Sequence, residues 1–139
     1  GSAVSVAAGM VPAAIGTDTA GSVRHPATAC GIVVFKPTYD VVSRNGVFPL
    51  AFSLDHIGSL AQSVADCTLL HGVMTGSGTL PQLPASCLKD LRVGVFEEFE
   101  AGADSEVGSA LEAAKVQLTQ RMPSSALGCA AASSLFRLR

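Results

Sequence analysis

The sequence predicts an α/β fold, because strand-like and helix-like patterns follow one another along its 139 residues. Residues 31–35 are an unbroken β-branched and aromatic run, typical of a buried strand, and residues 91–96 alternate as a second strand would. Residues 64–74 and 105–120 each repeat apolar side chains at the spacing of an amphipathic helix. Strand followed by helix therefore recurs along the chain.

The N-terminal residues 3–15 predict a different kind of helix, because they are small and apolar on every side. Such a helix must be buried all round, so its surroundings must come from a larger parent fold. Residues 16–24 form a turn-rich loop, and residues 26–30 can start a short helix that leads to the strand at 31–35.

Mostly irregular structure is predicted between that strand and the helix at 64–74. Residues 41–43 are expected to make a brief extended piece, and residues 44–46 carry the Arg-Asn-Gly signal of a turn. Residues 48–60 show little periodicity and are expected to be loop. Residues 63–66 then have the form of a capping box, which marks the start of the helix.

The C-terminal part divides into a structured and an unassigned segment. Asp104 or Ser105 is expected to cap the helix that runs to about Gln120. We therefore expect residues 1–121 to form one partial domain. Residues 122–139 show neither a helical stripe nor a strand alternation, and either disorder or a foreign tail would explain them.

Composition limits the possible partners. Only 14% of the residues are charged, against about 25% in an ordinary domain, so the chain resembles a core with some of its surface missing. It opens on Gly1 directly in a helical pattern, so a preceding segment is expected to be missing. The net charge of −2, without basic clusters, predicts neither a nucleic-acid nor a membrane partner.

No targeting, metal or redox signal is evident. The apolar run at residues 3–15 is too short to span a membrane and lacks the basic flank of a signal peptide. A cytoplasmic location is therefore the default expectation. The cysteines have no Cys-x-x-Cys spacing, which predicts free thiols rather than a zinc site or a redox pair. They are Cys30, Cys67, Cys87 and Cys129.

The turn-rich loop at residues 16–24 reads Gly-Thr-Asp-Thr-Ala-Gly-Ser-Val-Arg and is the candidate site. It places the hydroxyl of Ser22 among small residues, as an acyl-transfer nucleophile requires. The backbone N–H groups of Thr19, Ala20 and Gly21 are candidate donors to the oxygen that becomes an oxyanion.

Two other chemistries fit this loop less well. The glycines of residues 16–22 have the spacing of a phosphate-binding P-loop, but Ser22 stands where the lysine should be and no strand is predicted before the loop. A Ser-His-Asp triad could use His25 or His56 with Asp55, yet the adjacent Asp55 and His56 side chains would not naturally face one another. The histidines are therefore expected to be ordinary polar or capping residues.

Six ordered blocks together carry a resemblance to a known family. They are Gly-Ser-Ala, an alanine-rich stretch, Gly-Thr-Asp-Thr-Ala-Gly-Ser-Val-Arg-x-Pro-Ala, Cys-Gly-x-x-x-x-Lys-Pro-Thr, Ser-Arg-x-Gly-Val, and Ser-Leu-Asp-x-Ile-Gly. With these blocks, residues 1–76 closely resemble the amidase signature family, and residues 91–120 resemble the strand and helix that follow in its members. The chain is similar to a fragment of that fold, a mixed β-sheet covered by helices.

The resemblance implies a serine hydrolase that converts small carboxylic amides to a carboxylate and ammonia or an amine, through a Ser-cis-Ser-Lys triad and with no metal or organic cofactor. Ser22 matches the nucleophile, and the N–H groups of Thr19, Ala20, Gly21 and Ser22 itself match the oxyanion hole. Asp18 and Arg24 flank the loop with opposite charges and are expected to brace it.

The departures from the family pattern limit what the chain should do alone. Lys36 matches a family lysine that follows the strand, not the lysine of the triad. The triad lysine and the bridging serine are expected upstream of Gly1, so the chain as printed should be almost inactive, or else a non-catalytic polypeptide. Within the family, residues 47–50 and 53–56 favour a stand-alone amidase over the A subunit of a glutamyl-tRNA amidotransferase.

Overall fold

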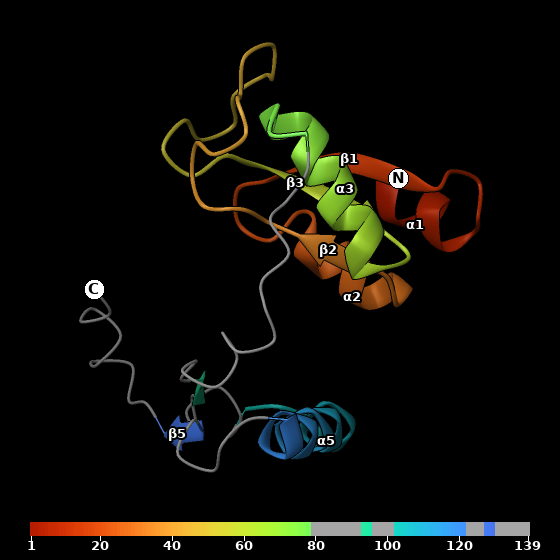
Figure 1. Ribbon diagram of the computed structural model, residues 1–139, viewed down its shortest axis with the longest axis vertical. Coiled ribbons are helices and arrows are strands. Elements are labelled where there is room, and N and C mark those ends of the chain that lie inside the picture. The colour runs from red at the N-terminus through yellow and green to blue at the C-terminus, as the bar shows by residue number, and fades with distance from the viewer. Residues whose placement is uncertain (79–92, 96–101, 122–126, 130–139) are drawn as a thin grey trace. The chain divides into compact units, whose positions relative to one another are not determined.

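The computed structural model describes residues 1–78, 93–95, 102–121 and 127–129 of the chain. The chain divides into two compact units, Gly1–Pro81 and Gln82–Arg139. The candidate site lies in the first unit (Figure 1).

A three-stranded antiparallel sheet organises the first unit. The strand order is β1-β3-β2, with β1 at Ala13–Asp18, β3 at His56–Ala61 and β2 at Val33–Phe35. The register pairs Asp18 with His56, so the residues that follow β1 lie beside those that precede β3. This pairing brings two segments of the chain together that are almost forty residues apart.

Helices cover both faces of this sheet. They are α1 (Ser2–Ala7), α2 (Arg24–Cys30) and α3 (Val64–Thr75). Leu60 of β3 packs with Ala3 and Ala27, from α1 and α2, whereas the neighbouring Ser59 donates a hydrogen bond to the Cys67 carbonyl of α3. Because successive strand residues point to opposite faces, α1 and α2 lie on one face and α3 on the other.

The helix predicted over residues 3–15 is confirmed over residues 3–7 and is wrong for the rest of that range. The helix α1 ends at Ala7, and the chain turns before it enters β1 at Ala13. Pro12 explains the break, because proline lacks the N–H that a helix interior needs yet is tolerated directly before a strand. Of the α1 side chains, Ala3 and Val6 are buried, so the helix is not enclosed on every side within the described residues.

The predicted loop at residues 48–60 is also wrong at its end, because residues 56–61 form the central strand β3. This strand is buried along nearly its whole length, so its sequence shows no alternation between polar and apolar side chains. Close packing against β2 explains why residue 58 of this strand is glycine, because a Cβ there would lie 2.9 Å from the carbonyl oxygen of Phe35.

The other predictions for this unit are largely confirmed. The helix α2 starts at Arg24, two residues before the predicted start, and β2 is shorter and less buried than expected. The turn after Arg44 is closed by a 3.0 Å hydrogen bond from the Val47 N–H, but no strand is assigned at residues 41–43.

The helix predicted over residues 64–74 is confirmed as α3. The Ser63 hydroxyl accepts the Asp66 N–H at 3.1 Å and donates to the Asp66 carboxylate at 2.6 Å. The capping interaction predicted from the sequence is therefore present, with the hydroxyl rather than the backbone N–H as the carboxylate's partner.

The second unit contains one helix and one pair of strands among its described residues. The helix α5 spans Ser105–Arg121, and Asp104 caps it by accepting the Val107 N–H at 3.0 Å. The strands β4 (Val93–Val95) and β5 (Leu127–Cys129) pair in parallel. The predicted strand and helix are confirmed, whereas β5 falls in the segment that the sequence left unassigned. No helix among the described residues is long and apolar enough to cross a membrane.

Candidate active site

The candidate nucleophile lies on the turn between β1 and α2. Ser22 is exposed, and its hydroxyl makes no hydrogen bond within the described part of the chain. It borders a cavity of about 460 Å3 that is also lined by Gly1 and Ser2 at the N-terminus and by Gly16 on β1. The hydroxyl is therefore open to a ligand in that cavity.

Asp18 holds this turn from within. Its side chain is completely buried, and the carboxylate accepts the Gly21 N–H at 2.8 Å and the Val23 N–H at 3.3 Å. Arg24 forms a two-pronged ion pair with the same carboxylate, through Nε and Nη2 at 3.0 Å each. The Arg24 hydrogen bonds, followed by those from Gly21 and Val23, hold the pKa of Asp18 well below its usual range despite burial.

This geometry is the one expected of bracing residues. Four hydrogen bonds to one buried carboxylate fix the backbone on both sides of Ser22. In turn, Asp18 raises the pKa of Arg24, whose side chain remains about half exposed. The contribution of the pair to activity stays a prediction.

The predicted oxyanion donors differ in their availability. The Gly21 N–H is already donated to Asp18, whereas the backbone hydrogen bonds of the described residues include none from the N–H of Thr19 or Ala20. Ala20 is exposed and Thr19 half-buried. The oxyanion role of these N–H groups also stays a prediction, and the geometry favours Thr19 and Ala20 over Gly21.

Gly21 has a backbone conformation, φ +129°, that other residues rarely adopt. A Cβ there would lie 2.6 Å from the His25 ring, which is exposed and free to turn away, so backbone strain is the larger effect. We expect Gly21→Ala to lower the free energy of unfolding by about 1–3 kcal/mol in urea titration. Gly108→Ala, in open space on α5, is the control; an equal effect of both changes would contradict the strain.

The structure does not assemble the Ser-His-Asp alternative. Asp55 accepts the Thr19 hydroxyl, and His56 is hydrogen-bonded through Nδ1 to the Leu54 carbonyl at 2.6 Å. Neither of these side chains, nor that of His25, is hydrogen-bonded to Ser22 within the described part of the chain. A strand, β1, does precede the loop, contrary to the expectation used against a P-loop; the missing lysine still argues against that interpretation.

Asp55, considered above only as a possible triad member, has a different role that the sequence did not reveal: it contacts Thr19. Its buried carboxylate accepts the Thr19 hydroxyl at 2.5 Å, the Leu50 N–H at 2.9 Å and the Ala51 N–H at 3.1 Å. The Thr19 bond, followed by those from Ala51 and Leu50 and by the charge of Arg44, holds the pKa of Asp55 below its usual range. The available signal was an acidic residue at the start of a buried strand, which does not indicate Thr19 as its partner because that contact depends on the strand register.

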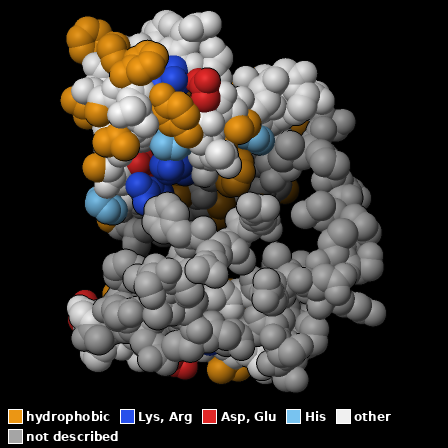
Figure 2. All heavy atoms as spheres, turned by 90° about the vertical axis from the view of Figure 1, so that its left-hand side faces the viewer, with side chains coloured by type: hydrophobic (Ala, Val, Ile, Leu, Met, Phe, Trp, Pro, Cys, Tyr) orange, Lys and Arg blue, Asp and Glu red, His pale blue; other side chains and the backbone are white. Residues whose placement is uncertain are grey.

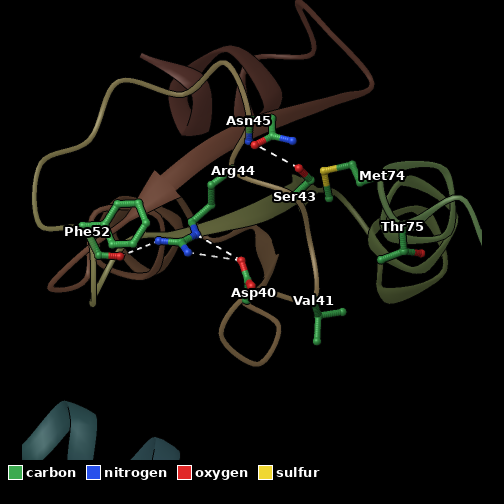
Figure 3. A pocket seen from close by; sticks show the side chains of 8 residues that line it. All are labelled: Asp40, Val41, Ser43, Arg44, Asn45, Phe52, Met74 and Thr75. Carbon is green, nitrogen blue, oxygen red and sulfur yellow. Dashed lines mark hydrogen bonds and ion pairs between the residues drawn. The ribbon is translucent and has the colours of Figure 1, made fainter.

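A second cavity of about 440 Å3 lies between the loop after β2 and the end of α3 (Figure 3). Arg44 crosses it: its guanidinium is bonded to Asp40 and to the Phe52 carbonyl and lies 4.4 Å from the centre of the Tyr39 ring and 4.6 Å from that of Phe52. These contacts hold the segment that leads to Asp55.

The segment of residues 47–54, which lies between the turn after Arg44 and Asp55, exposes large apolar side chains. Figure 2 shows hydrophobic side chains gathered on this face of the first unit. On the segment they are Phe48, Leu50, Phe52 and Leu54, and Phe48 is 94% exposed.

Comparison with known proteins identifies the family. A family model described as Amidase matches residues 1–122. The chain therefore belongs to the amidase signature family, and the predicted fold class is confirmed by solved members of similar structure.

The chain is similar to several named members of this family. The chain is 45% identical over 127 residues to the A subunit of glutamyl-tRNA(Gln) amidotransferase from Roseiflexus sp. (strain RS-1), covering 82% of this chain and 26% of that protein. The solved A subunit from Thermotoga maritima is 33% identical with a TM-score of 0.77, covering 94% of this chain and 31% of that one. Native peptide amidase from Stenotrophomonas maltophilia is 28% identical with a TM-score of 0.70, covering 94% and 29%. The chain thus spans about a quarter to a third of the length of these relatives.

Proposed function

We propose that this chain carries the nucleophile segment of an enzyme that hydrolyses carboxylic amides through an acyl-Ser22 intermediate. The observation that carries the proposal is the open Ser22 hydroxyl at a cavity, on a turn braced by buried Asp18. Attack by the Ser22 oxygen on the amide carbon would give a tetrahedral oxyanion beside the Thr19 and Ala20 N–H groups.

The remaining steps balance with water alone. Collapse of the tetrahedral intermediate breaks the C–N bond, and the leaving nitrogen takes a proton and departs as ammonia or an amine. Water then hydrolyses the ester of Ser22 to a carboxylate and restores the hydroxyl. The group that removes the Ser22 proton is proposed to be the lysine expected upstream of Gly1, relayed by a bridging serine, so the chain as printed is proposed to be inactive.

A more specific candidate is the A subunit of a glutamyl-tRNA amidotransferase. Eight relatives of the chain bear that name, at 41–46% identity. The shared name of these relatives favours the amidotransferase over the stand-alone amidase that residues 47–50 and 53–56 suggested, although among solved structures an amidase (36% identical) and the Thermotoga maritima A subunit (33% identical) are similar to the chain to a comparable degree. In that case the chain would work with partner chains, and the amide would be processed within a complex. A cytoplasmic location stays a prediction.

Ammonia release from a panel of primary amides, glutamine included, tests the proposal. The printed chain is compared with a form of the protein extended upstream to include the expected lysine and serine. We expect ammonia only from the extended form, at a rate that depends on Ser22. A folded extended form that releases no ammonia from any amide, with or without partner chains, would contradict the proposal.

A further inference from the structure

We propose that Asp55 is a positioning residue that ties the Ser22 turn to the 47–54 segment. The inference rests on the proposed function, because it assigns Asp55 a task in placing the groups around Ser22. Asp55 lies one residue before β3, opposite the end of β1, where the strand register brings it beside Thr19.

The contacts of Asp55 reach two separate parts of the chain. On one side the carboxylate accepts the N–H groups of Leu50 and Ala51, and its own N–H donates to the Ala51 carbonyl at 2.9 Å. On the other side it accepts the Thr19 hydroxyl at 2.5 Å, across 36 residues of sequence. A single buried carboxylate therefore links both segments through charge-assisted hydrogen bonds.

Through Thr19, the position of Asp55 can affect the backbone of the Ser22 turn. Thr19 is the first residue after β1, directly following the Asp18 that holds the far side of the turn. Two aspartates thus clamp the turn from opposite ends: Asp18 through the Gly21 and Val23 N–H groups, and Asp55 through the Thr19 side chain. The orientation of the Thr19 and Ala20 N–H groups then depends on both clamps.

The other end of the link is the apolar 47–54 segment. Phe48, Leu50, Phe52 and Leu54 are all exposed there, and Arg44 holds the segment through the Phe52 carbonyl (Figure 3). A contact that displaces Leu50 and Ala51 would also act on the Asp55 carboxylate, which accepts both their N–H groups and the Thr19 hydroxyl. The structure thereby couples the position of the segment to the geometry of the Ser22 turn.

Backbone hydrogen exchange by NMR tests the coupling without requiring activity. Asp55→Asn and Thr19→Val should each accelerate exchange at the Gly21 and Val23 N–H groups by about tenfold or more, because the turn opens locally. Asp66→Asn is the matched control, since the Asp66 carboxylate also accepts a hydroxyl, that of Ser63, but at the start of α3. If Asp55→Asn changes exchange only at Leu50 and Ala51, Asp55 merely holds its own turn and the proposal is overturned.

The rate of Ser22 modification by a fluorophosphonate, measured in the upstream-extended protein, gives a second readout. Asp55→Asn and Thr19→Val should slow this modification about tenfold or more. Thr19→Ser keeps the hydroxyl and should therefore react much faster than Thr19→Val. The control Asp66→Asn should leave the rate unchanged. An unchanged rate in Asp55→Asn overturns the positioning role. An unmodified wild-type protein instead overturns the proposed function, and the exchange experiment then decides the coupling separately.

Discussion

Replacing Ser22 by alanine is expected to reduce amide hydrolysis by the upstream-extended protein by several orders of magnitude, because no other group would attack the amide carbon. The fold should be nearly unchanged, since the hydroxyl makes no hydrogen bond within the described part of the chain. Ammonia release and thermal unfolding of the same preparation measure the two effects.

Ser77→Ala is the matched control for that experiment, because Ser77 is another exposed loop serine of the same unit and lies outside the 47–54 segment. It should keep the wild-type rate. Retained hydrolysis in Ser22→Ala would remove Ser22 from the mechanism, whereas a parallel loss in Ser77→Ala would point to general damage of the loops.

Removal of the Asp18 carboxylate is expected to have the largest effect on stability. Asp18→Ala would leave the buried N–H groups of Gly21 and Val23 without their acceptor and Arg24 without its partner. Each buried N–H left without its acceptor costs about 1–3 kcal/mol of unfolding free energy, whereas the lost ion pair adds little because the Arg24 side chain is about half exposed. The sum for the two N–H groups, about 2–6 kcal/mol, is a large share of the total in an ordinary domain. Urea titration of the chain measures it, and a loss as small as that of an exposed residue would contradict the bracing role.

The Asp18 carboxylate should also make the free energy of unfolding depend on pH in the acidic range. The pKa of Asp18 is lower in the folded chain than the value of about 3.9 in an unfolded one. Its stabilising contribution is therefore complete above about pH 5 and is lost as the pH falls through 4 toward the folded-state value.

Asp18→Asn isolates this contribution, because the amide keeps the shape of the side chain but does not titrate. Asp55 also has a lowered pKa, so the wild-type chain and the variant share its acid dependence. The difference in unfolding free energy between them should shrink as the pH falls below about 5. A difference that is constant from about pH 7 to about pH 3 would contradict the assignment.

The parts that could be predicted from the sequence are those with local signals. The helix α3 could be predicted because Ser63 and Asp66 cap it and its apolar residues repeat at helical spacing. The turn that carries Ser22 was visible in its small residues, and the charges of Asp18 and Arg24 lie close enough in sequence to suggest a pair.

The parts that could not be predicted depend on contacts between distant residues. The strand β3 is buried along nearly its whole length, which removes the alternation that marks a half-buried strand. The first half of β1, residues 13–15, is small and apolar enough to suit a buried helix as well, and its second half, residues 16–18, has the composition of a turn and was predicted as loop. Only Pro12 indicated that the helix ends before residue 13. The contact of Asp55 with Thr19 could not be predicted either, because the two residues are 36 positions apart and only the register of β1 and β3 brings them together.

The most direct test of the whole account is mass mapping after fluorophosphonate treatment of the printed chain and of the upstream-extended protein, side by side. We expect an adduct on Ser22 in the extended protein and none, or almost none, in the printed chain. An adduct on another serine, or no adduct in a folded extended protein, would contradict this expectation.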